Sequence, residues 1–125
     1  MLYRKNILTI AALCAAIMLA PRMASAHAFP KRENPAAGAT LNSPPSQVTI
    51  DFDAPIEKLF AKLTVLDSSG RNLASEPVVG DAGKRLSAAL PLLKPGDYKV
   101  AWSVVCRDSH RTEGSYQFTV SGSPH

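Results

Sequence analysis

Apolar and polar residues alternate along several short stretches of the chain, which is the pattern of half-buried β-strands. The clearest of these stretches are residues 47–53, 59–66, 98–106 and 115–120. In the third stretch, Tyr98, Val100, Trp102 and Val104 fall on one face. Short strands separated by turn signals every eight to twelve residues, roughly, are typical of a β-sandwich or barrel. We therefore expect one all-β domain.

Two weaker strands are predicted at 71–75 and 84–90, joined to their neighbours by turns rich in Gly, Asp and Ser. Helix is an alternative for 84–90 because Ala and Leu dominate it. We favour a strand there, since Leu86, Ala88 and Leu90 share one face and a proline follows. The Pro- and Gly-rich segment 28–45 is expected to form a turn-rich lead-in.

The first 26 residues have the features of a cleavable secretory signal peptide. Arg4 and Lys5 precede an apolar run of about 14 residues, and Ala24-Ser25-Ala26 is an A-x-A cleavage signal. A transmembrane anchor is the alternative, but spanning a bilayer takes ~20 residues. Because Cys14 lies inside the apolar run rather than after it, a lipoprotein is also disfavoured. We expect a mature domain of residues 27–125 in the periplasm.

Removal of this leader changes the composition. Three of the 14 basic residues and none of the ten acidic residues would leave, so the net charge falls from +4 to +1. The basic balance is therefore no argument for nucleic-acid binding. All three methionines and Cys14 would leave as well, and Cys106 would be the single cysteine. An internal disulfide is then impossible, and the domain has to rely on its hydrophobic core.

Candidate metal ligands lie at two distant places. Asp108 and His110 would point to the same side of an extended segment and suit Cu(II) or Zn(II), although such a pair is commonly part of a solvated loop. Cleavage after Ala26 would give His27 a free α-amine beside its imidazole, and the two nitrogens can close a chelate ring that favours Cu(II). A histidine could also follow the cleavage site by chance. The amine, two imidazoles and a carboxylate form a candidate N3O set, and no ligand role is predicted for His125.

Several segments of the predicted mature chain match the pattern of a known protein family. They are His27 after Ala-Ser-Ala and residues 35–41, 95–102, 108–110 and 114–120. With these segments the chain resembles the CopC/PcoC family of periplasmic copper-resistance proteins over nearly its whole mature length. The resemblance implies an Ig-like or cupredoxin-like Greek-key β-sandwich or barrel. It also implies one Cu(II) per monomer, bound by His27, Asp108 and His110, and a membrane copper-transport partner.

The chain departs from this family pattern at three places. Family members with a second site bind Cu(I) through a Met-rich loop, and residues 27–125 contain no methionine. Many members have a second histidine two positions after the first, where this chain has Phe29. Cys106 stands where serine is common, and its thiol is interpreted either as a possible copper reductant or ligand or as a small residue at a strand end.

Three functions follow from these features. The leading prediction is a non-enzymatic periplasmic carrier or buffer of Cu(II), acting in copper resistance and homeostasis. A copper ion held by an N-terminal histidine is also the beginning of the histidine brace of oxidative polysaccharide-cleaving enzymes, but the short chain and few aromatic residues disfavour a broad substrate face. The third alternative is an Ig-like interaction domain in which Asp108 and His110 bind no metal.

Overall fold

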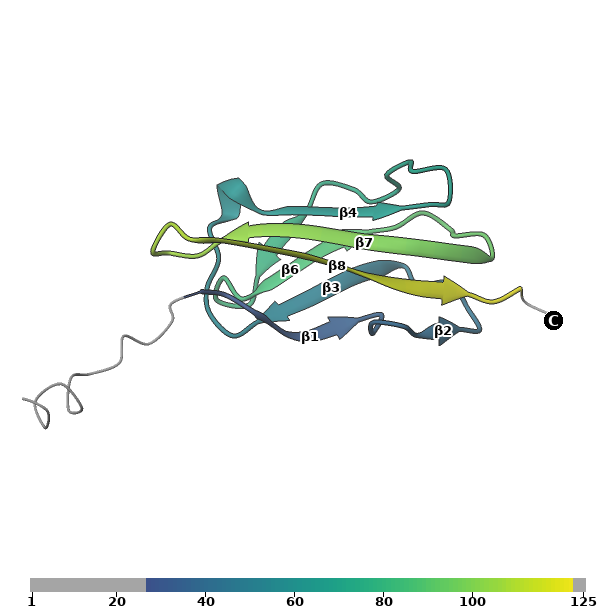
Figure 1. Ribbon diagram of the computed structural model, residues 1–125, viewed down its shortest axis with the longest axis horizontal. Helices are drawn as coiled ribbons and strands as arrows, with labels where there is room; N and C mark the ends of the chain where they lie inside the picture. The colour runs from purple at the N-terminus through teal and green to yellow at the C-terminus, as the bar shows by residue number, and fades with distance from the viewer. Residues whose placement is uncertain (1–26, 123–125) are drawn as a thin grey trace, which may run out of the picture.

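Two four-stranded β-sheets pack against each other in the computed structural model, which describes residues 27–122 (Figure 1). One sheet has the strand order β1-β3-β6-β5 and the other β2-β8-β7-β4. All pairings are antiparallel except that of β2 with β8. The strands are β1 (Pro30–Asn34), β2 (Thr40–Leu41), β3 (Gln47–Phe52), β4 (Lys62–Leu66), β5 (Val78–Gly80), β6 (Arg85–Ala89), β7 (Gly96–Val105) and β8 (Arg111–Val120). The expected all-β sandwich is confirmed.

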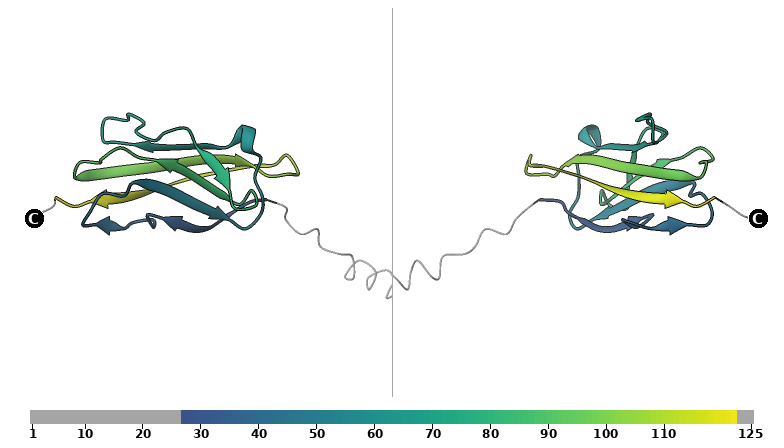
Figure 2. Two further views of the ribbon diagram at one scale, coloured as in Figure 1. Left: turned by 180° about the vertical axis from the view of Figure 1, so that it is seen from behind. Right: turned by 45° about the vertical axis from the view of Figure 1, so that its right-hand side comes forward.

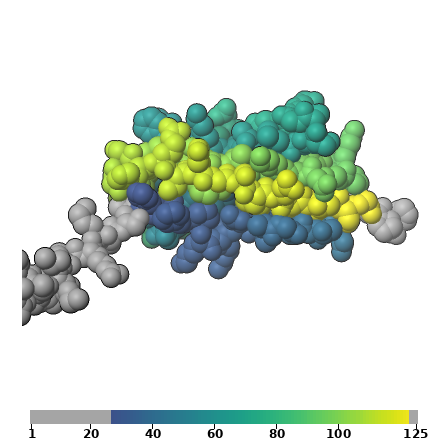
Figure 3. Space-filling model, viewed as in Figure 1, coloured from purple at the N-terminus to yellow at the C-terminus, as the bar shows by residue number. Residues whose placement is uncertain are grey.

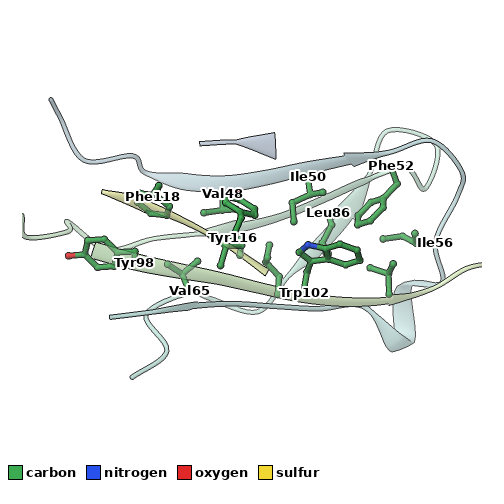
Figure 4. Close-up of a cluster of buried hydrophobic side chains, with 14 of the residues drawn as sticks. Val48, Ile50, Phe52, Ile56, Val65, Leu86, Tyr98, Trp102, Tyr116 and Phe118 are labelled. Atoms are coloured by element: carbon green, nitrogen blue, oxygen red, sulfur yellow. The ribbon is translucent and has the colours of Figure 1, made fainter. Parts of the chain in front are cut away.

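The core lies between the two sheets and is built from the inward positions of the alternating strands (Figure 4). In β3 and β7 every second residue is buried, as the alternation predicts. Trp102 and Phe52 come from opposite sheets and meet edge to face, with ring centroids 5.3 Å apart, a favoured aromatic geometry. Within residues 27–122, no helix is long and apolar enough to span a membrane.

Several element predictions for the first half of the chain need correction. The expected lead-in contains strands β1 and β2, and Pro30 is tolerated because it is the first residue of an edge strand. The predicted strand 59–66 begins only at Lys62, since residues Lys58–Phe60 form a 3-10 helix. The segment 71–75 makes a single bridge, and the strand lies at β5 instead. There the Asn72 side chain accepts the Val65 and Ala74 amides and so replaces regular pairing.

The long β7–β8 hairpin extends to one end of the sandwich (Figures 1 and 2). Its second strand starts at Arg111, four residues before the predicted start. The alternation of apolar and polar residues did not indicate the earlier start, because the inward positions there are a polar Thr112 and a glycine, Gly114, which has no side chain. The hairpin therefore ends in a short loop that contains Asp108 and His110. The predicted signal peptide, residues 1–26, lies outside the described residues.

Candidate metal centre

A tight loop from Cys106 to His110 joins β7 and β8. It is closed by a hydrogen bond from the Cys106 amide to the His110 carbonyl (2.9 Å) and another from the Ser109 amide to the Cys106 carbonyl (3.0 Å). Ser109 has a φ of 72°, in the left-handed region that ordinary side chains seldom adopt. The segment is therefore a turn, and the predicted extended conformation of residues 108–110 is wrong.

The turn nevertheless brings the Asp108 and His110 side chains together. Asp108 Oδ1 accepts the His110 backbone amide at 3.1 Å, and Asp108 Oδ2 lies 3.0 Å from His110 Nδ1. The His110 side chain is 62% exposed and that of Asp108 is 32% exposed, so both can be reached by an ion from solvent. Hydrogen bonds from the Cys106 thiol and from the His110 side chain lower the pKa of Asp108 to about 2. The carboxylate is therefore ionised throughout the neutral and mildly acidic range.

His27 reaches this loop because the residues after it are fixed to the sandwich. Ala28 is fully buried, and its carbonyl accepts a 2.7 Å hydrogen bond from the Thr112 hydroxyl on β8. Phe29 pairs with Asp53 through two hydrogen bonds, one to the Asp53 carboxylate (2.8 Å) and one from the Asp53 amide (3.0 Å). In Figure 3 the purple start of the described chain lies against the yellow-green end of the hairpin.

The three predicted ligands consequently meet at one end of the domain. Each of His27, Asp108 and His110 offers a donor atom, and these atoms all lie within 4.8 Å of one another. The two imidazole rings have centroids 4.5 Å apart. None of the three residues belongs to the core, and they come from segments more than 80 positions apart in the chain.

The spacing of these donors fits a metal ion. Two ligands bound at ~2.0 Å in adjacent square-planar positions lie roughly 2.8 Å apart, and opposite ligands about 4 Å apart. The 3.0 Å between Asp108 Oδ2 and His110 Nδ1 matches the adjacent positions. The three donor atoms are at most 4.8 Å apart, which exceeds the distance between opposite ligands by less than about 1 Å. A small rotation of exposed or half-buried side chains closes that difference.

Residues that support the site were harder to foresee than the donors. Thr112 and Ala28 position His27, yet a strand threonine and a small apolar residue give no functional signal in the sequence. Cys106 is at the strand end, as one of its two interpretations held, and is 1% exposed. Its thiol is hydrogen-bonded to Asp108 Oδ1. Arg107 and Glu113 are exposed and lie outside the three-residue donor group.

Comparisons with known proteins identify relatives of this chain. The chain is 33% identical over 98 residues to protein YobA of Escherichia coli, covering 76% of this chain and 79% of YobA. It is 27% identical over 107 residues to "copper transport protein CutJ" of Bacillus subtilis, covering 83% of this chain but only 20% of CutJ.

Solved structures show the same sandwich. CopC from Methylosinus trichosporium OB3b superposes with a TM-score of 0.73 at 29% identity, covering 79% of this chain and 98% of that one. PcoC, described as a methionine-rich copper resistance protein from Escherichia coli, gives a TM-score of 0.65 at 27% identity, covering 77% of this chain and all of that one. The sequence model of the CopC domain matches residues 31–121. The chain therefore belongs to the CopC domain family.

Proposed function

We propose that this protein is a non-enzymatic periplasmic carrier or buffer that binds one Cu(II) ion per monomer through His27, Asp108 and His110. The observation that supports this most directly is the meeting of these three donors at one end of the sandwich. Two imidazoles and a carboxylate are ligands that suit Cu(II). The proposal places the protein in copper resistance and homeostasis. Among its relatives, CutJ is named a copper transport protein and PcoC a copper resistance protein.

The proposal includes cleavage of residues 1–26. The charged start, the apolar run and Ala24-Ser25-Ala26 support a signal peptide. Cleavage would leave His27 with a free amine beside its imidazole. This amine would be the fourth donor of the site, in addition to the two imidazoles and the carboxylate. Because a cleaved leader is the mark of export, the domain of residues 27–125 would act in the periplasm.

The ligand chemistry also distinguishes between the oxidation states of copper. Thioether and thiolate ligands select Cu(I), whereas imidazole, amine and carboxylate suit Cu(II). Residues 27–125 contain no methionine, and Cys106 is buried. We therefore propose a single Cu(II) site without a separate Cu(I) site. A membrane copper-transport protein is the proposed recipient or donor of the ion. The relative CutJ is named a copper transport protein, and the region that matches this chain is a fifth of its length.

Spectroscopy of the copper-loaded, correctly cleaved protein tests the proposal. A type-2 electron paramagnetic resonance signal with nitrogen hyperfine couplings is the expected result. An intense blue thiolate-to-copper band would instead show that Cys106 is a ligand. Turnover driven by peroxide or a reductant with copper bound would contradict the non-enzymatic assignment.

Replacing His110 by alanine is expected to weaken Cu(II) binding roughly tenfold or more, with the fold retained. The side chain is 62% exposed and packs little of the core, so its loss removes a ligand without opening a cavity. Competition with a chromophoric chelator measures the affinity, and thermal unfolding of the metal-free protein measures stability. His125→Ala is the matched control, because it removes an imidazole for which no ligand role is predicted. Equal affinity of both variants would contradict the assignment.

The pH dependence of copper release follows from the lowered pKa of Asp108. With that pKa at about 2, Asp108 binds no proton between pH 4 and 7, roughly, and cannot cause copper release there. Release on acidification then comes from protonation of the nitrogen ligands, which must be deprotonated to bind. An Asp108→Asn variant is expected to bind Cu(II) more weakly at every pH but with the same steepness of proton-dependent loss. Titrating copper release in both proteins checks this; a shallower pH dependence in Asp108→Asn would contradict it.

A further inference from the structure

We propose that Cys106 is a positioning residue for the copper site: its buried thiol donates a hydrogen bond to Asp108 Oδ1 and so leaves Oδ2 of that carboxylate to face the ion. This inference rests on the proposed function and extends it to a residue that does not itself bind the metal. It concerns how a single oxygen of Asp108 is presented to copper.

The contacts of the thiol support this role. Cys106 Sγ is hydrogen-bonded to Asp108 Oδ1 and lies 3.3 Å from the His110 carbonyl oxygen. A carboxylate and a carbonyl are both acceptors, so the hydrogen in these contacts belongs to the thiol. Cys106 is 1% exposed, and its backbone is held by the His110 carbonyl and by a bridge to Ile56. The donor is therefore fixed in place before any ion arrives.

The two oxygens of Asp108 have different partners as a result. Oδ1 accepts both the Cys106 thiol and the His110 backbone amide, whereas Oδ2 faces His110 Nδ1 at 3.0 Å. Oδ1 is therefore held by two donors that are not proposed copper ligands, whereas the partner of Oδ2 is the side chain of a proposed ligand, His110. Such an arrangement favours a monodentate carboxylate in an adjacent position to His110. Outer partners of this kind orient metal ligands, and their loss typically lowers metal affinity about 10- to 100-fold.

The position of Cys106 does not suit a direct ligand. The donor atoms that lie within 4.8 Å of one another belong to His27, Asp108 and His110. The Cys106 side chain belongs instead to the buried cluster of the sandwich, beneath the exposed loop. Its thiol is linked to the site by hydrogen bonds to Asp108 Oδ1 and to the His110 carbonyl.

Two substitutions separate hydrogen bonding from packing. Cys106→Ser keeps a donor at the same position, whereas Cys106→Ala removes the donor and leaves a similar small side chain. We expect Cys106→Ala to lower Cu(II) affinity about tenfold and to change the copper electron paramagnetic resonance parameters. Cys106→Ser should stay within about threefold of the unmodified protein. Cu(II) alone is the probe, with the protein processed by cells, its N-terminus checked by mass spectrometry, and affinity measured by chelator competition.

A double-mutant cycle with Asp108→Ala makes the test specific to the hydrogen bond. In the Asp108→Ala background the effect of Cys106→Ala on affinity should disappear, since the acceptor is gone. Val100→Ala, a buried change farther along β7, controls for a general loss of stability and should leave affinity unchanged in the folded protein.

The possible failures can be told apart. If Cys106→Ala binds Cu(II) as tightly as the unmodified protein, or if its effect persists in the Asp108→Ala background, the positioning role is wrong while the proposed function stands. Loss of an intense thiolate charge-transfer band in Cys106→Ser would also overturn it, by making Cys106 a ligand. If the unmodified protein itself fails to bind Cu(II), the proposed function fails.

Discussion

Adding one glycine before His27 is expected to lower the Cu(II) affinity of the protein by about a hundredfold or more. The addition turns the α-amine into an amide and so removes one end of the proposed chelate, while His27 keeps its imidazole. Loss of an outer partner of a metal ligand costs about 10- to 100-fold, so loss of a bound nitrogen should reach or exceed the upper end of that range. Affinity is measured by chelator competition on proteins whose N-termini are confirmed by mass spectrometry.

The matched control adds one glycine after His125, which changes the mass equally and leaves the proposed site intact. The metal-free proteins should unfold at the same temperature, because Ala28 and Phe29 still anchor the segment to Thr112 and Asp53. Undiminished affinity in the N-terminally extended protein would show that the amine is not a ligand. It would leave the site with the three side-chain donors alone.

The sequence identified the three residues of the candidate site, but not the reason they converge. His27, Asp108 and His110 were proposed as one site, and the structure brings them together. The extended geometry expected for Asp108 and His110 was wrong, because the local pattern does not reveal that Ser109 adopts a positive φ. The hydrogen bond from Thr112 to Ala28 joins residues 84 positions apart, so no local rule could have found it.

The strands were predictable wherever apolar side chains alternate with polar ones. Strands β3 and β7 follow this rule along their length, and β6 was correctly preferred over a helix. The prediction failed where an inward position lacks an apolar side chain, as at the beginning of β8, or where a strand lies at a polar edge, as in β1. In both places pairing with a neighbouring strand decides the conformation. The alternation of residues within one segment does not show which strand it pairs with.

Gly114 lies at one such inward position of β8, and the proposed copper site depends on the hairpin around it. It pairs directly with Trp102 on β7, whose indole occupies the space where a side chain on residue 114 would be. A Cβ added there would lie 2.7 Å from Trp102 Cζ2 and 3.0 Å from Cε2. Trp102 cannot easily move aside, because it is 8% exposed and packs edge to face on Phe52.

Gly114→Ala is accordingly expected to destabilise the domain by about 2 to 3 kcal/mol, the upper part of the usual range for overpacking a core. For a domain of this size that lowers the midpoint of thermal unfolding by roughly 10–20 °C. Gly80→Ala is the matched control: it makes the same change in a β-strand, has no atom within 4 Å of the new Cβ, and should alter stability by less than about 1 kcal/mol. Calorimetry of the two metal-free variants compares them. Equal unfolding temperatures would mean that Trp102 can repack, and that the glycine is not what keeps the indole between the sheets.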